Sequence, residues 1–312
     1  MATTTAPKRP TRRGHADQRP AKPSVMRRIL TFPVTWMIIG TVFVFLTNAI
    51  LVGVGSEMDT TGVIVTALIG AAAGLLFYTL TMWLVARRRT PELTLRGIGR
   101  ETVLGLAIGV LFIAVSYLIV VATGAYSVVW APHDVTTTVA LALAVNAGAA
   151  IVEELTFRGL LFQGIEQLGG PRVGRWIALG VTAAFFGGAH LLNPGATLWS
   201  SLAIAIEAGV LLGAAFTWRR NMWFVIGIHF AWNVVEGLLG IPVSGHRDPG
   251  LFVTTVHGDG LLSGGAFGLE ASFVPVLVSL AVAVPMLVAA RRRRVAPTVS
   301  AARDVRLDAT AR

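Results

Sequence analysis

Cysteine is absent from this chain of 312 residues, and charged residues are scarce. The lack of cysteine excludes a disulfide scaffold, a thiolate metal site and a cysteine nucleophile. Asp, Glu, Lys and Arg make up only 13% of the sequence, whereas a soluble domain carries about 25%. By contrast, 54% of the residues are hydrophobic and the mean hydropathy is +0.70. This composition predicts a membrane protein.

The net charge of +10 is concentrated at the two ends of the chain. Residues 1–30 contain eight Lys or Arg and one acid, and residues 291–312 contain seven Arg and two Asp. The intervening residues 31–290 contain eleven Arg and thirteen acids. Basic ends on a near-neutral apolar body indicate a membrane protein and not a nucleic-acid-binding domain. We expect a disordered basic tail at 1–28, a transmembrane domain at 29–290, and a basic cytoplasmic tail beyond it.

Long uncharged runs predict the membrane-spanning helices. A span needs roughly 20 mostly apolar residues to cross about 30 Å of hydrocarbon, and only helices or closed barrels satisfy the backbone there. The apolar runs are continuous and not alternating, which favours helices. The basic segment before the first helix is too long for a signal peptide, so we expect that helix to be retained. We predict an all-α polytopic fold with eight spans, at about 33–54, 62–86, 102–123, 137–165, 176–193, 196–217, 221–240 and 271–290.

Basic clusters between these helices predict the orientation. If the N-terminus is cytoplasmic, all five clusters fall on the cytoplasmic side, and the opposite loops carry mainly acids, as the positive-inside rule favours. The clusters are the N-terminal tail, Arg87–Arg89, Arg172 with Arg175, Arg219–Arg220 and Arg291–Arg294. We therefore expect a multi-pass protein of a cell membrane with both termini in the cytoplasm. The Arg- and Ala-rich composition favours a bacterial plasma membrane.

Two adjacent carboxylates interrupt the fourth predicted helix, at a depth where ionisable groups are costly and often mark a site. Adjacent residues on a helix point about 100° apart, so Glu153 and Glu154 have different surroundings. Glu154 precedes Arg158 by four residues and can pair with it, while Glu153 shares a face with Asn146. One acid is thereby neutralised and the other stays reactive. The alternative interpretation is a buried structural ion pair beside a Glu without a role.

Two histidines add polar groups on two further predicted helices. His190 follows Phe186 by four residues. His229 precedes Asn233 by four, so these two share a helix face. Glu236 continues this face at i+7. Together, the carboxylate, histidines and amide supply a general base, a proton carrier and hydrogen-bond donors. These are the groups needed for attack of water on a carbonyl.

Three motifs in chain order over about 135–240 resemble the signature of the CPBP family: Glu153-Glu154-x-x-x-Arg158, Phe186-x-x-x-His190 and His229-x-x-x-Asn233. This family, also called Abi, comprises intramembrane endopeptidases related to the prenyl-protein CAAX protease and to bacteriocin-processing and self-immunity proteins. The resemblance implies hydrolysis of a peptide bond in a membrane-associated protein or peptide. Its expected partners are that substrate and the lipid bilayer, with no nucleic acid.

The resemblance also implies a role for each motif residue. Glu153 and His190 would activate the attacking water, and His229 with Asn233 would stabilise the tetrahedral oxyanion. Glu154 and Arg158 would hold the site together. Arg158 is in addition a candidate for steering either the substrate's carboxylate or the Glu153 side chain.

The sequence leaves open whether the reaction depends on a metal, and it allows two other functions. The family has been described both as metalloproteases and as glutamate proteases. One Glu and two His suffice for a three-ligand zinc site, but the His-Glu-x-x-His arrangement is absent, so we favour a reaction without a cofactor, with zinc as the alternative. A non-catalytic immunity or scaffold protein is a second candidate function. A proton-coupled transporter is a third, kept open by Glu207 and Glu236, although paired broken helices in matching halves are absent from the sequence pattern.

Overall fold

The structure, a computed structural model, describes residues 24–132 and 134–309, with side chains up to residue 292. Most of the predicted N-terminal tail, residues 1–23, lies outside the described residues. Its last residues belong to a short helix, α1 (Val25–Leu30), in which the Ser24 side chain accepts a hydrogen bond from the Arg27 amide. The chain enters its first long helix directly after α1.

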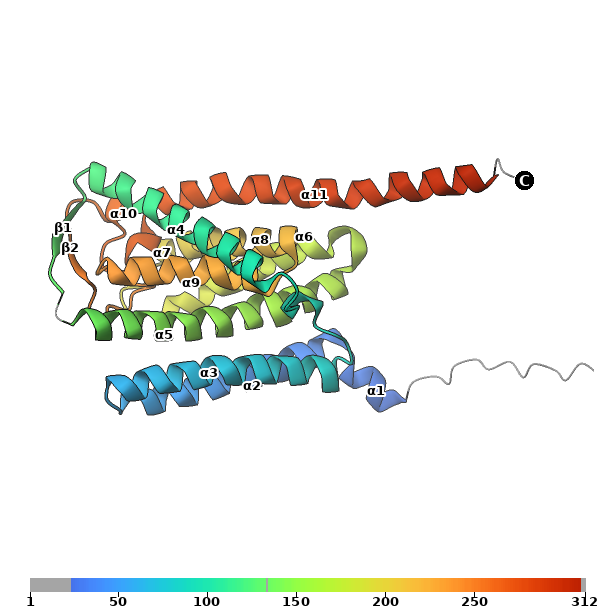
Figure 1. Cartoon of the computed structure of the whole chain (residues 1–312), viewed down its shortest axis with the longest axis horizontal. Helices are drawn as coiled ribbons and strands as arrows, with labels where there is room; N and C mark the ends of the chain where they lie inside the picture. The colour runs from blue at the N-terminus through green and yellow to red at the C-terminus, as the bar shows by residue number, and fades with distance from the viewer. Residues whose placement is uncertain (1–23, 133, 310–312) are drawn as a thin grey trace, which may run out of the picture.

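Apolar helices that run along one common direction form the body of the protein (Figure 1). The predicted all-α polytopic fold is confirmed, since six helices are long and apolar enough to cross a membrane. The N-terminal helices are α2 (Pro33–Ser56), α3 (Thr60–Leu80) with its extension η1 (Thr81–Val85), the short turn η2 (Pro91–Leu93), and α4 (Ile98–Ala122). The later ones are α5 (Val135–Glu154), η3 (Leu155–Phe162), α6 (Gln163–Ala189), η4 (His190–Leu192), α7 (Leu198–Ile204), η5 (Ala205–Val210), α8 (Leu211–Arg219), α9 (Met222–Leu238) and α11 (Phe273–Ala309).

The predicted fourth and fifth helices are joined into one helical segment, Val135–Leu192, that reverses direction at Gly170. Gly170 has φ 74°, a left-handed conformation that only glycine adopts without strain. Pro171 follows it and starts the returning helix, because a first-turn proline lacks an N–H that would be unpaired there anyway. The reversal divides one of the six long helices into two apolar segments, and the shorter apolar helix Met222–Leu238 adds another. The described residues therefore contain all eight predicted apolar segments. How many of them cross the membrane stays a prediction.

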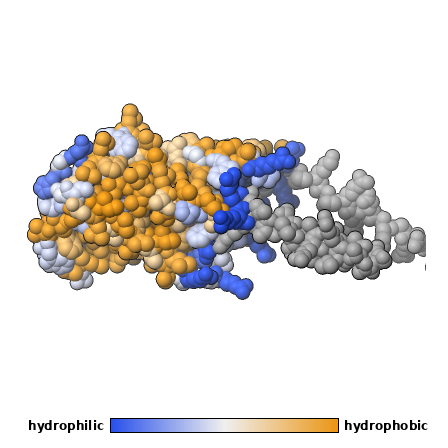
Figure 2. All heavy atoms as spheres, turned by 90° about the horizontal axis from the view of Figure 1, so that it is seen from above, coloured by the Kyte–Doolittle hydropathy of each residue, from blue (hydrophilic) through white to orange (hydrophobic). Residues whose placement is uncertain are grey.

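Basic clusters gather at one end of the helix bundle. The Arg88 guanidinium donates to Gln163 Oε1 at 3.1 Å, Arg220 pairs with Glu166 at 2.5 Å, and the Arg291 guanidinium lies 5.7 Å from the Trp176 ring centre. Figure 2 shows hydrophobic residues over the middle of the molecule and hydrophilic ones towards its ends. Clusters far apart in the sequence therefore lie on one side, as the predicted topology requires.

Reporter fusions test that topology. A fusion at residue 255, in the loop between α9 and α11, should report the external side, and a fusion at residue 300 should report the cytoplasm. The physical reason is the gathering of the arginine clusters at the end opposite that loop. The measurement is the activity of a paired periplasm-specific and cytoplasm-specific reporter. Signals on the same side at both positions would contradict the eight-span arrangement.

The long connection between α9 and α11 has a structure that the sequence pattern does not reveal. Its strand β2 (Phe252–Val256) pairs antiparallel with β1 (Tyr126–Trp130), and the short helix α10 (Gly260–Ser263) and the turn η6 (Leu269–Ala271) follow. The Tyr126 hydroxyl donates to the Ser263 carbonyl at 2.5 Å. These contacts hold the connection against the end of the helix bundle opposite the arginine clusters (Figure 1).

Close packing of α4 against α9 fixes the position of the second histidine helix. A Cβ atom at Gly105 would collide with the Phe224 carbonyl oxygen, and one at Gly109 with the Ile228 carbonyl oxygen. Small residues allow such close approach of helix backbones in membranes. Because His229 directly follows the second of these contacts, α4 serves as the rigid support behind it.

Candidate active site

A cavity of about 340 Å³ lies among α5, α6, α9 and the loop after α9. Four of the six predicted site residues line it: Glu153, His190, His229 and Asn233. Asn146 lines it too, as its seven-residue spacing from Glu153 predicts. The wall formed by α2 and α5 is mainly apolar, with Phe45, Leu141, Ala142, Val145 and Ala149. The cavity therefore joins a polar centre to a hydrophobic wall.

Glu154 and Arg158 lie behind the cavity wall and form a buried ion pair. The Arg158 Nη1 atom lies 2.8 Å from Glu154 Oε1, and the two side chains are 1% and 0% exposed. Arg158 Nη2 also donates to the Ala208 and Gly209 carbonyls, at 2.8 and 3.2 Å. These carbonyls belong to the π-helical segment η5, and such segments recur at functional sites. Arg158 is not among the residues that line the cavity, and a role in steering a substrate carboxylate or Glu153 stays a prediction.

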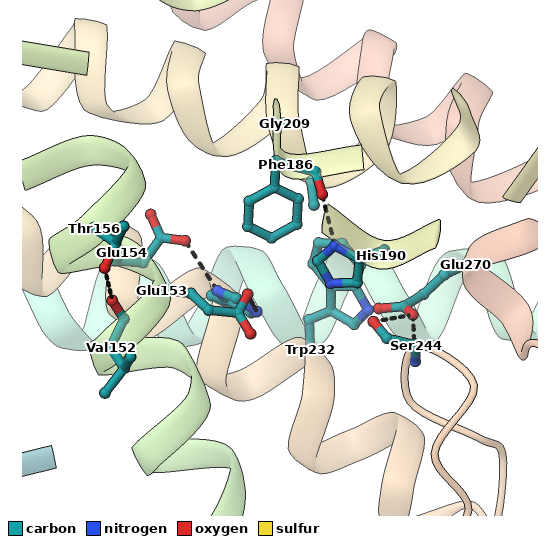
Figure 3. A network of polar contacts seen from close by, with 12 residues as sticks. Val152, Glu153, Glu154, Thr156, Phe186, His190, Gly209, Trp232, Ser244 and Glu270 are labelled. Atoms are coloured by element: carbon teal, nitrogen blue, oxygen red, sulfur yellow. Dashed lines mark hydrogen bonds and ion pairs between the residues drawn. The ribbon is translucent and has the colours of Figure 1, made fainter. Parts of the chain in front are cut away.

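His229 is held by the same carboxylate that pairs with Arg158. Its Nδ1 lies 2.9 Å from Glu154 Oε1, and a carboxylate can only accept, so Nδ1 carries the proton. Its Nε2 lies 3.9 Å from Glu153 Oε2. Of the two adjacent acids, Glu154 therefore orients the histidine, whereas Glu153, with 26% of its side chain exposed, faces the cavity. Figure 3 shows these two carboxylates pointing in different directions from one helix.

The Phe186-x-x-x-His190 motif sets the orientation of the other histidine. His190 Nδ1 lies 2.7 Å from the Phe186 carbonyl oxygen, which makes Nδ1 the protonated nitrogen of the neutral ring. The Phe186 ring stacks on His190 at 4.8 Å between ring centres and lies 5.0 Å from the Arg158 guanidinium. His190 Nε2 is consequently left with a lone pair for proton transfer.

Asn233 lies one turn after His229 on α9 and is buried. Both residues line the cavity, as their four-residue spacing predicts. The Asn233 Oδ1 atom has no hydrogen-bond partner within the part of the chain that the structure describes. This unpaired oxygen can accept a hydrogen bond from a bound molecule, whereas the Nδ2 group of the same amide is the donor.

The comparison with known families agrees with this geometry. Residues 135–235 match the family model for the type II CAAX prenyl endopeptidase, Rce1-like. These residues form a CAAX-protease-family domain. The matched range contains all six predicted site residues and ends two residues after Asn233. Neither the comparison with curated proteins nor that with solved structures gave a match.

Residues beyond the Rce1-like domain complete the cavity, and the sequence pattern did not assign them to the site. Glu270 and Ser244 line it from the connection between α9 and α11. The Ser244 amide and hydroxyl donate to Glu270 Oε2 at 2.6 and 2.8 Å. The available signal was the run Phe-Gly-Leu-Glu-Ala-Ser-Phe at 267–273, in which a single acid stands among apolar residues.

Glu236 and Glu207 are buried but lie outside the cavity lining. Glu236 lies on α9 seven residues after His229, as predicted, but its side chain is not part of the cavity lining. Glu236 instead accepts hydrogen bonds from Trp232 Nε1 at 3.0 Å and from the Leu269 amide at 3.1 Å, because a buried indole N–H needs an acceptor. The carboxylate oxygens of Glu207 have no hydrogen-bond partner among the described residues.

The three candidate zinc ligands, Glu153, His190 and His229, do not come together around one point in this structure. Among the residues that the structure describes, no group of three or more His, Cys, Asp and Glu side chains is placed to hold a metal ion. Glu153 and His229 approach each other, but His190 does not complete a ligand triangle with them. The three side chains are therefore not placed as the three ligands of a catalytic zinc site in this geometry.

Proposed function

We propose that this chain is an intramembrane endopeptidase in which Glu153 and His190 activate a water molecule for attack on a peptide bond. The observation that carries the proposal is the cavity itself. A carboxylate and an imidazole with a free Nε2 face the same cavity as a His–Asn pair on another helix. General bases beside hydrogen-bond donors for a developing oxyanion are what peptide hydrolysis requires.

Proton transfer follows from the hydrogen bonds of each group. Glu153 has no ion pair with a Lys or Arg among the described residues, and its one charged contact is His229. Its carboxylate can therefore take a proton from water as the oxygen attacks the carbonyl carbon. Because His190 Nδ1 donates to Phe186, its Nε2 can take up the proton that Glu153 received from water and pass it to the leaving nitrogen, which returns Glu153 to its carboxylate form. The C–N bond then breaks, and the products are a carboxylic acid and an amine.

His229 and Asn233 lie where they can stabilise the tetrahedral intermediate. When His229 carries both ring protons, Nδ1 donates to Glu154 and Nε2 donates into the cavity towards Glu153 or the oxyanion. The Asn233 amide supplies a second, neutral donor one turn along α9. One such donor contributes about 10²–10³ in rate.

The substrate that fits the lining is a membrane-associated peptide segment. The apolar wall formed by α2 and α5 suits hydrophobic side chains, and the polar centre lies at one end of that wall. Substrate trapping tests the proposal. Full-length Glu153→Gln protein and wild type are purified from the same membranes, and the peptides retained by each are identified by mass spectrometry. Intact precursors are expected on the variant, and their cleaved products in wild-type membranes.

Metal removal tests the mechanism without a cofactor. Strong chelators should leave cleavage of a trapped precursor intact, because the proposed proton transfers use only side chains. Metal analysis of the active protein should accordingly find no stoichiometric ion. A transition metal at about one per chain, lost and restored together with activity, would refute this part of the proposal.

A further inference from the structure

The charged residues that line the cavity are acidic. Glu153, Asp248 and Glu270 contribute to its surface, and no Lys or Arg of the described residues does. Arg158, the nearest candidate from the motifs, is buried behind the wall in contact with Glu154 and two carbonyls. A substrate that ended in a free carboxylate beside the cleaved bond would place a negative charge here without a Lys or Arg to pair with it, which is unfavourable in a buried site.

Glu270 is the acid best placed to contact a bound molecule. It is 2% exposed, and its Oε2 accepts both hydrogen bonds from Ser244. Its Oε1 has no hydrogen-bond partner among the described residues, although the side chain lines the cavity. The Asn193 Nδ2 atom donates to the Ser244 carbonyl at 2.9 Å, which ties this loop to the turn that begins at His190. Figure 3 shows Glu270 and Ser244 on the side of His190, away from Glu153.

We propose that Glu270 forms a subsite for a positively charged side chain of the substrate, so that the enzyme cuts internal bonds next to Lys or Arg in membrane-associated peptides. This inference rests on the proposed function. A buried carboxylate with one oxygen held by Ser244 and the other facing a cavity is stabilised by a cation with hydrogen-bond donors. Lys and Arg are the side chains that supply both.

Burial raises the pKa of Glu270, and hydrogen bonds from Ser244 oppose that rise. The titratable groups that interact electrostatically with Glu270 include the two histidines His190 and His229 and the two buried acids Glu207 and Glu236. A raised pKa means that part of the carboxyl population is protonated at a pH above the ordinary range of Glu. Because a cation binds the ionised form, its binding should strengthen as the pH rises through that range.

Photo-crosslinking of matched peptides tests the subsite without requiring cleavage. Three hydrophobic peptides with amidated C-termini carry a diazirine and differ only at one position beside the central bond, which is Lys, norleucine or Glu. In the full-length protein in detergent, the Lys peptide should label the cavity about 10-fold more strongly than the Glu peptide, the scale of one charge-assisted hydrogen bond. Glu270→Gln should reduce this preference to about 2-fold or less, and the matched variant Glu57→Gln should leave it unchanged.

Ser244→Ala is the second variant, for use if Glu270→Gln does not fold. It removes only the hydroxyl donor to Glu270 and should weaken the preference for the Lys peptide less than Glu270→Gln does. Equal labelling by the Lys and Glu peptides in wild type would overturn the inference, as would an unchanged preference in Glu270→Gln. A lysine preference in a protein that traps and cleaves no precursor would place the failure in the proposed function and leave the cation subsite in place.

Discussion

Replacing Glu153 by Gln should lower the rate of peptide cleavage by about 10²–10⁴-fold, the usual contribution of a general base, and leave the folded yield unchanged. The carboxamide keeps the size of the side chain but cannot take the proton of the attacking water. The side chain is part-exposed to the cavity and its closest charged contact is His229 at 3.9 Å, so the fold does not depend on its charge. The measurement is cleavage of a trapped precursor, together with elution from a sizing column in detergent.

Two further variants provide reference values for this result, one as a control and one at a second residue of the site. Glu57→Gln changes an exposed acid at the end of α2 and should keep wild-type activity. Asn233→Ala removes one donor to the oxyanion and should cost about 10²–10³ in rate. A Glu153→Gln protein that folds normally and retains near-wild-type proteolysis would show that the site has been assigned to the wrong residues.

Glu154→Gln should lower the free energy of unfolding by about 3–5 kcal/mol. Arg158 is 1% exposed, and without its carboxylate partner it would be a buried charge in contact with the Ala208 and Gly209 carbonyls and the Phe186 ring alone among the groups described above. His229 would also lose its charged acceptor, so any folded fraction should cleave slowly. The measurement is folded yield and thermal unfolding in detergent, followed by cleavage per folded molecule.

A double variant separates the two effects. Glu154→Leu combined with Arg158→Met removes both buried charges, and replacing such a pair by apolar side chains is often tolerated. Part of the folded yield should return, while activity should stay low because His229 has no acceptor for Nδ1. If Glu154→Gln alone were as stable as wild type, the ion pair would not support the fold as described.

The sequence predicts the features that depend on local spacing. Hydropathy alone places the helices, and the four-residue spacing of Glu154 and Arg158 predicts an ion pair that the structure contains. The same spacing correctly brings His229 and Asn233 to one cavity. In each case the contact is decided within one helix, where the geometry is fixed at 3.6 residues per turn.

Contacts between distant segments could not be predicted in this way. The bond from Glu154 to His229 joins residues 75 positions apart, and the contribution of Glu270 depends on how the connection after α9 folds back through β2. Glu236 shows the limit of the helical rule itself. Its backbone position fits the His229 face. Its carboxylate, however, accepts hydrogen bonds from Trp232 Nε1 and the Leu269 amide and is not part of the cavity lining.

The position of the cavity at the end opposite the arginine clusters determines which reagents reach it. Its lining extends from Glu153 to the exposed loop residues Asp248 and Pro249, beside the ribbon of β1 and β2. With the predicted orientation, that loop faces the outside of the cell. We therefore expect an inhibitor that is too polar to cross the bilayer to block the enzyme in intact cells.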